Sequence, residues 1–360
     1  MMIRQTAVHL LLLAVAALVV GGCATGPYRA RGEPQTPQPI AGSVLKALRL
    51  EAAVEDRVLA LNPRQISGDD VRDTLAKTPA PRIILLHGGL YPVYLAMSSF
   101  AEFLIDMGYP EASLRREDGV LDSVYSYSPY LDSAQLAGLV AWYYEHEGMR
   151  PMLVGHSQGG VQVVKVLDDL AGVFASEIHV WNPLIDSAEE RVTIVDPLTG
   201  AQRPVIGIKA SYASAVGAGG AAFLLPNQWS MMHRLRTIPD TVDEFTGFSI
   251  NVDLIAFSFP GARGASEYRS SGTASVRNVF LPSWYNHVVI PVTRQLAASD
   301  PMRDWLNAYA PDRPGQADAI PPGPSVNALW AADVWYSIKK HWCLEAQRLI
   351  RARRAAAGQG

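Results

Sequence analysis

Residues 151–163 read PMLVGHSQGGVQV, so a short apolar run meets a helical pattern at a glycine-rich turn. Gly155 and Gly159 stand two positions before and after Ser157. Glycine at both flanks lets a strand and the following helix approach closely, while the turn holds the serine in a strained backbone conformation. The serine is then expected at the positive end of the helix, where N–H groups stabilise a developing anion. We therefore predict that Ser157 is a nucleophile that follows a buried strand.

Strands and helices alternate on both sides of this turn. Short apolar runs indicate strands at residues 82–86, 124–127, 151–154, 178–181, 254–259 and 276–281. Amphipathic patterns indicate helices at residues 43–60, 96–107, 134–146, 161–170, from about 292, and 328–354. This alternation predicts an α/β fold in which helices cover both faces of a mostly parallel sheet.

The alternation breaks between residues 182 and 247. Residues 192–195 and 205–208 flank a turn-rich connection and predict a hairpin, and an apolar, aromatic stretch follows at residues 223–232. We predict that about residues 182–247 form a cap inserted into a single domain of residues 43–360.

The chain from about His87 to His287 resembles the α/β-hydrolase superfamily, in particular its serine esterases and lipases. Their nucleophile turn often reads as residues 155–159 do here. The resemblance implies the α/β-hydrolase fold and a triad in the chain order nucleophile, acid, histidine. It also implies an oxyanion hole made by the backbone N–H groups of Gln158 and Gly89, with Leu90 as the alternative to Gly89.

A serine hydroxyl needs a nearby base, and histidine suits this role because its ordinary pKa lies near neutrality. Among the eight histidines, His287 lies in a polar loop directly after the last predicted strand. The related family carries its catalytic histidine at this place. We therefore predict His287 as the base.

The sequence leaves three candidates for the acid that orients the histidine. If the seventh strand is residues 254–259, the loop after it offers Glu267. If that strand is residues 245–250, the acid is Asp253. A third candidate, Asp186, follows the strand predicted at residues 178–181. We prefer Glu267 because residues 254–259 form the more continuous apolar run.

The N-terminus has the order of a secretory signal peptide: a positive charge, an apolar run, then small residues before Cys23. This segment resembles the lipobox of bacterial lipoproteins, which implies removal of residues 1–22 and a lipid on Cys23. The alternative is an uncleaved anchor or an ordinary signal peptide. Residues 23–42 are rich in Pro, Gly and Gln and are predicted to form a flexible tether. Ala24 resembles the signal for sorting to the outer membrane of a Gram-negative bacterium, on its periplasmic side or surface.

Composition excludes several other classes of protein. The formal net charge is −3, and no basic stripe suited to nucleic acid is present. With two cysteines, one of them Cys23, the chain has neither a disulfide framework nor a cysteine-based metal site. We expect no metal or organic cofactor.

The expected function is hydrolysis of a carboxylic ester, apolar or lipid-like, through an acyl-enzyme on Ser157. Two alternatives remain at this stage. One is an acyltransferase that uses the same triad, and the other is a cell-envelope lipoprotein that binds a partner without catalysis.

Overall fold

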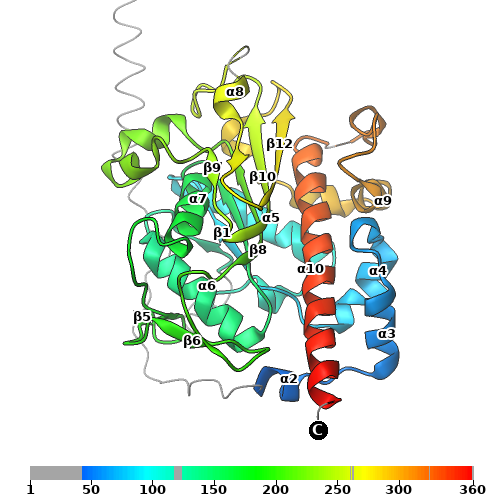
Figure 1. The fold of residues 1–360 in the computed structure, drawn as a ribbon. Coiled ribbons are helices and arrows are strands. Elements are labelled where there is room, and N and C mark those ends of the chain that lie inside the picture. Colours follow the sequence, from blue (N-terminus) through cyan, green and yellow to red (C-terminus); the bar gives the residue numbers. More distant parts are fainter. Residues whose placement is uncertain (1–42, 117–123, 260, 262, 324, 359–360) are drawn as a thin grey trace, which may run out of the picture.

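The computed structural model describes residues 43–116, 124–259, 261, 263–323 and 325–358. A six-stranded sheet with strand order β2-β1-β3-β8-β10-β12 forms the centre of the molecule, and every neighbouring pair is parallel (Figure 1). Its strands are β1 Ile83–Leu86, β2 Ser126–Tyr127, β3 Met152–His156, β8 Ala210–Val216, β10 Val242–Ile250 and β12 Ser275–Leu281. The predicted α/β class is confirmed. The signal peptide, Cys23 and the tether lie outside the described residues.

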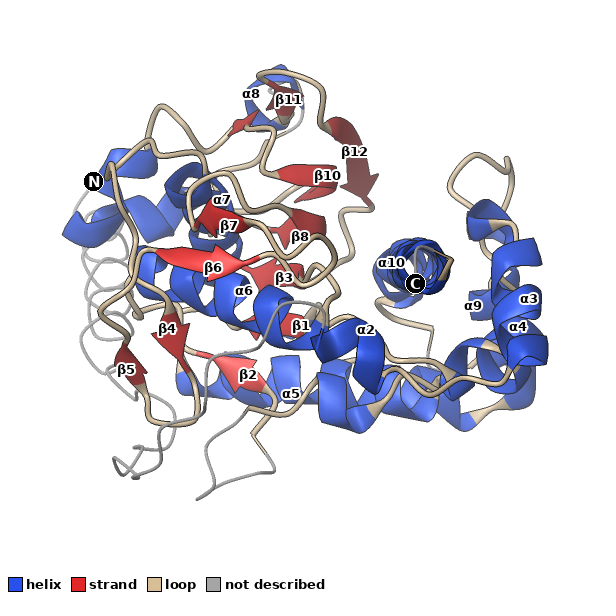
Figure 2. Ribbon diagram, turned by 60° about the horizontal axis from the view of Figure 1, so that its bottom comes forward, coloured by secondary structure: helices blue, strands red, loops and turns tan. Residues whose placement is uncertain are grey.

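Helices cover both faces of this sheet because side chains alternate across each strand. The main helices are α5 Tyr91–Asp106, α6 Ser133–Glu147, α7 Gln158–Leu170 and α10 Ala328–Ala357. One face packs against α5 and α10 in a core that includes Phe100, Trp330 and Trp335. The other face packs against α6 and α7 in a second core that includes Leu139 and Val164. Figure 2 shows the sheet between these two layers.

Shorter elements surround the two layers. The remaining helices are α2 Ser43–Ala47, α3 Ala52–Ala60, α4 Gly68–Asp73, α8 Arg263–Ser266 and α9 Asp300–Ala308. The small strand pairs are β4 Trp181–Asn182 with β5 Ser187–Ala188, β6 Thr193–Val195 with β7 Gln202–Pro204, and β9 Thr237–Ile238 with β11 Arg269–Ser270. None of the helices within the described ranges is both long and apolar enough to cross a bilayer.

The predicted cap at residues 182–247 is wrong in its extent. Residues 210–216 form β8, the strand between β3 and β10 in the central sheet. The sequence hid this strand because its alanines and serines are small and lack the β-branched side chains typical of strands. The hairpin predicted within this region is present as β6 and β7, but residues 178–181 do not join the central sheet.

The strand predicted at residues 254–259 is also wrong. This segment is a tight turn closed by two backbone hydrogen bonds between Asp253 and Ser258. Its apolar side chains face solvent, with Leu254 71% and Phe257 58% exposed. The seventh strand is instead β10, which contains residues 245–250, the alternative that the sequence left open.

Candidate active site

Three strands end at the same edge of the sheet and carry the candidate residues there. Ser157 directly follows β3, Asp253 follows β10, and His287 follows β12. The chain order of β1, β2 and β3 places β2 and β3 on opposite sides of β1, so the strand order reverses between β1 and β3. In open parallel sheets, ligands bind outside the carboxyl ends of the strands at such a reversal. Ser157 lies at this point.

Ser157, His287 and Asp253 form a continuous chain of hydrogen bonds. The Nε2 atom of His287 lies 2.8 Å from Ser157 Oγ, and its Nδ1 atom lies 2.6 Å from Asp253 Oδ2. A carboxylate only accepts, so Nδ1 carries the proton and Nε2 accepts from the serine hydroxyl. This arrangement leaves the imidazole ready to take a proton from Ser157.

The surroundings of Asp253 keep its carboxylate ionised although it is only 3% exposed. Burial raises the pKa of this carboxyl, but hydrogen bonds and charge from His287, together with the N–H groups of Ala256 and Ile255, outweigh burial and lower the pKa below its ordinary value. Oδ1 accepts these two N–H groups at 3.0 and 2.9 Å. The turn at residues 253–258 therefore holds Oδ2 toward His287.

The turn around Ser157 has the strained geometry that its glycines predict. Ser157 has φ 55° and ψ −122°, a conformation that favours glycine. A Cβ at Gly155 would lie 2.3 Å from the carbonyl oxygen of Gly159, and a Cβ at Gly159 would lie 2.1 Å from that of Leu86. Both glycines are therefore required by the close packing of β3, α7 and β1.

We expect Gly159→Ala to destabilise the protein by about 3 kcal/mol, since the added methyl group meets rigid backbone. The measurement is the free energy of unfolding from denaturant titration. Gly264→Ala is the matched control because a Cβ there meets no atom within 4 Å. Equal stability of the two variants would contradict the close packing.

The two residues predicted to supply the oxyanion hole adjoin each other. A Cβ on Gly89 would lie 2.6 Å from Gln158 Oε1, and a Cβ on Gly88 would lie 3.2 Å from Ser157 Cβ. Gln158 is the first residue of α7, whose first N–H groups have no partner within the helix. The Tyr130 hydroxyl donates to the carbonyl oxygen of Gly89 at 2.9 Å. Their role in binding an oxyanion stays a prediction.

His156 links the nucleophile turn to the loop that carries His287. It is fully buried, and its Nε2 atom donates to the carbonyl oxygen of His287 at 2.7 Å. Burial and the nearby His287 lower the pKa of His156 to about 3, so its ring is neutral at neutral pH. It therefore holds the loop in place and does not compete as a base.

The sequence did not identify Gly217 as a site residue. It follows β8 with φ 62°, and a Cβ there would lie 2.8 Å from Cε1 of His287. Only glycine lets the imidazole pack against this backbone. The signal available in the sequence was the glycine run at residues 217–220, which gains this meaning only once β8 is recognised as a strand.

The preferred acid of the sequence analysis, Glu267, is not the partner of His287. The carboxylate bonded to the imidazole is Asp253, because residues 254–259 form a turn and the strand that delivers the acid is β10. Asp186 lies between β4 and β5, a two-stranded pair separate from the central sheet. Among the described residues, no cluster of three or more His, Cys, Asp or Glu side chains has the arrangement of a metal site.

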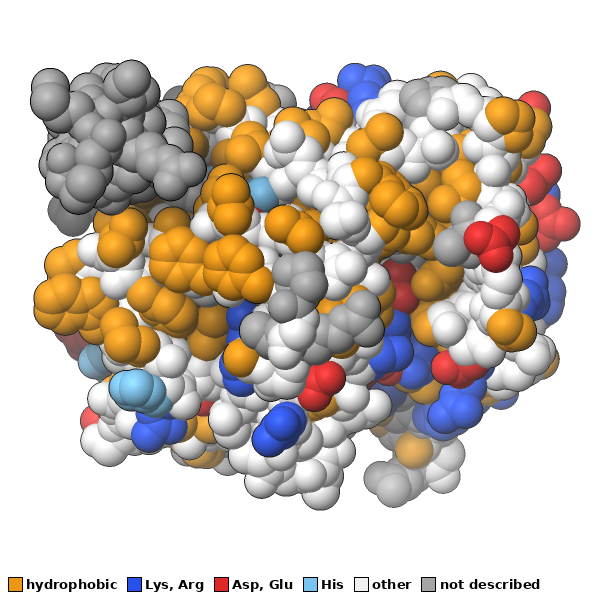
Figure 3. Space-filling view, turned by 90° about the horizontal axis from the view of Figure 1, so that it is seen from above, with side chains coloured by type: hydrophobic (Ala, Val, Ile, Leu, Met, Phe, Trp, Pro, Cys, Tyr) orange, Lys and Arg blue, Asp and Glu red, His pale blue; other side chains and the backbone are white. Residues whose placement is uncertain are grey.

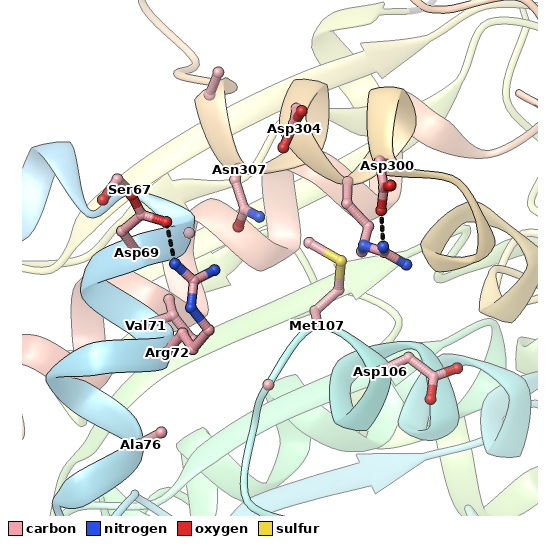
Figure 4. A pocket seen from close by; sticks show the side chains of 14 residues that line it. Ser67, Asp69, Val71, Arg72, Ala76, Asp106, Met107, Asp300, Asp304 and Asn307 are labelled. Carbon is pink, nitrogen blue, oxygen red and sulfur yellow. Dashed lines mark hydrogen bonds and ion pairs between the residues drawn. The ribbon is translucent and has the colours of Figure 1, made fainter.

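A separate cleft of about 860 Å³ lies between α4, the end of α5, and α9 (Figure 4). Its two arginines pair with aspartates of the same walls, Arg72 with Asp69 and Arg303 with Asp300. Ser157 is not among its lining residues. We interpret it as a polar surface cleft because it contains no nucleophile beside a base.

Comparisons with known proteins add little to this description. No protein-family model and no curated protein match the sequence. Among solved structures, the chain is similar to RedJ, described with a polyethylene glycol molecule bound in its active site. The identity is 16%, the match covers 64% of this chain and 90% of that chain, and the TM-score is 0.30. A likeness this weak supports no conclusion about activity.

Proposed function

We propose that this protein is a serine hydrolase of the α/β-hydrolase type that cleaves carboxylic esters through an acyl-enzyme on Ser157. The observation that carries the proposal is the hydrogen-bond chain from Asp253 through His287 to Ser157, with distances of 2.6 and 2.8 Å. The chain order serine, aspartate, histidine is the one used by α/β-hydrolases.

In the proposed reaction, Ser157 Oγ attacks the ester carbonyl carbon while His287 Nε2 takes its proton. The carbonyl oxygen becomes an oxyanion and accepts hydrogen bonds from the N–H groups of Gln158 and Gly89. The intermediate collapses as His287 returns the proton to the departing alcohol. Water then attacks the acyl-enzyme, with His287 again as base, and releases the carboxylic acid. Asp253 fixes the Nδ1–H tautomer and stabilises the imidazolium.

The surroundings of the site favour an apolar ester. Large hydrophobic side chains are exposed beside two members of the triad, among them Leu254, Phe257 and Trp284. We also propose that the chain is exported and anchored through a lipid on Cys23 in the outer membrane. That part of the proposal rests on the N-terminal sequence alone.

Reaction with a fluorophosphonate tests the chemistry without knowledge of the natural ester. We expect one phosphonyl group per chain, located on Ser157 by peptide mass spectrometry, because only a serine activated by a base reacts with this reagent. Ser214, a buried serine of β8 that is not part of the triad, is the internal control and should stay unlabelled. An intact chain that stays unlabelled would refute the proposed hydrolase.

A further inference from the structure

Most large exposed apolar side chains lie in loops at the edge of the sheet that carries Ser157. Among the described residues, all large exposed hydrophobic side chains except Val173 and Phe174 lie in six segments: 91–95, 130, 224–232, 252–259, 284–289 and 326. We name these side chains the apolar rim. Figure 3 shows hydrophobic side chains spread over much of the face seen from above.

Hydrogen bonds connect the segments of the apolar rim with the triad. The 224–232 segment follows residues 220–222, where the N–H of Ala221 donates to the carbonyl oxygen of Ile255 at 2.8 Å. His287 bonds to Asp253, which directly precedes the turn that exposes Leu254 and Phe257. The Asn327 side chain, next to Val326, donates to the carbonyl oxygen of Val289 at 2.7 Å. Segments 91–95 and 130 follow the carboxyl ends of β1 and β2, and the Tyr130 hydroxyl donates to the carbonyl oxygen of Gly89. The rim therefore surrounds the edge of the sheet that carries Ser157.

The segments that carry the apolar rim are almost free of charge. Residues 88–99, 128–131, 217–232, 250–259 and 282–293 contain one Asp or Glu and no Lys or Arg, in a chain with 18% charged residues. That one carboxylate is Asp253, which is 3% exposed and faces His287. An exposed apolar patch of this kind marks an interaction site. Charged side chains stand only at its border, among them Asp132, Arg294 and Lys165, which bonds to the carbonyl oxygen of Asn227. Because the patch itself carries no exposed charge, it suits hydrocarbon better than a charged surface.

We propose that the apolar rim docks on a lipid surface, with the hydrocarbon of uncharged phospholipid as its partner. A second copy of this chain or a permanent protein partner on the same face would cover Ser157, whereas a lipid surface would itself present an apolar ester. The inference rests on the proposed function, because only an esterase needs Ser157 to reach an ester in the lipid surface. It also rests on the proposed lipid at Cys23, which would bring the chain to a membrane.

The chain between Cys23 and the described domain is long enough for the apolar rim to face the membrane that holds the lipid. Ser43 begins α2, at the bottom of Figure 1, whereas the carboxyl ends of the sheet strands point toward the top. Residues 23 to 43 span about 70 Å when fully extended. A domain of this size has a radius of gyration of about 20 Å and hence a diameter of about 50 Å. A lipid on Cys23 and the apolar rim can therefore reach the same membrane.

The test places a fluorescent label on the rim of the full chain and measures its exposure to iodide. Leu254→Cys and Leu224→Cys, at 71% and 57% exposure, carry the label, and Val173→Cys outside the rim is the matched control. Neither native cysteine competes for the label, because Cys343 is fully buried and the thiol of Cys23 carries the proposed lipid. All three variants carry Ser157→Ala, so the measurement is independent of hydrolysis and of the outcome of fluorophosphonate labelling.

On vesicles of phosphatidylcholine, we expect iodide quenching at positions 254 and 224 to fall about tenfold, since hydrocarbon favours a leucine-sized group by at least that factor. Quenching at position 173 should not change, and anionic lipid or added salt should have no effect. Equal quenching at all three positions would overturn the proposal. So would protection only on anionic vesicles, which indicates electrostatic binding, or protection without vesicles, which indicates self-association.

Discussion

Ser157→Ala is expected to lower kcat for a short p-nitrophenyl ester by about six orders of magnitude, the loss found when the nucleophile of a serine triad is removed. The reason is that no other hydroxyl lies 2.8 Å from the base His287 Nε2 in the described structure. Stopped assays at high enzyme concentration measure the residual rate. A variant that keeps more than about one hundredth of the rate would show that another group performs the attack.

A second substitution at the same position separates chemistry from folding. Ser157 has φ 55° and ψ −122°, a conformation that costs a non-glycine residue about 1–3 kcal/mol. Ser157→Ala keeps that strain, so its free energy of unfolding should match the original chain. Ser157→Gly should be equally inactive yet more stable by about 1 kcal/mol, after the larger entropy of unfolded glycine is counted. A less stable glycine variant would contradict the strained turn.

The strained turn at Ser157 was predictable from the sequence because its signal is local. Strand, turn and helix at residues 151–163 are contiguous, and the glycines needed for their packing stand two positions from the serine. His287 was predictable from one further fact, its place after the last strand. In each case a few neighbouring residues determine the local structure, so long-range packing changes little of what their sequence pattern predicts.

The carboxylate that bonds to His287 and the extent of the cap were not predictable for the opposite reason. Residues 254–259 have the composition of a buried strand, yet five of the hydrophobic side chains in residues 252–259 are exposed. Residues 210–216 look like a loop and form a fully buried strand. Composition reports the preference of a side chain for an apolar environment, which a sheet core or a lipid surface can equally supply. The apolar composition that misled the strand prediction is, because its side chains are exposed, also the observation behind the apolar rim.

Asp253→Asn is expected to lower kcat by about four orders of magnitude, as the equivalent change does in other serine triads. The carboxamide keeps the size of the carboxylate, but its NH2 group can donate to Nδ1 and so favour the tautomer with its proton on Nε2. That proton would point at Ser157 Oγ, 2.8 Å away, and the imidazole would lose the lone pair that accepts the serine proton. The KM should change much less than kcat, because Asp253 is buried and contacts the ring on the side away from Ser157.

Glu267→Gln is the matched control, since the two carboxylates were the leading candidates on sequence grounds and only one contacts the imidazole. Its rate should stay within about twofold of the original chain, the usual range for a substitution away from a network. The reverse pattern, with a large loss at position 267 and a small one at 253, would mean that β10 and its turn do not supply the acid. Large losses at both positions would indicate that Glu267 acts on the turn at residues 253–258, and a stability measurement of Glu267→Gln would detect this.

Because Asp253 has a pKa below the ordinary carboxyl range, its ionised form also stabilises the fold above the pKa of an unfolded aspartate, near 4. That stability is lost as the pH falls through the lower folded pKa, so the asparagine variant should lose less stability than the original chain on acidification below pH 4.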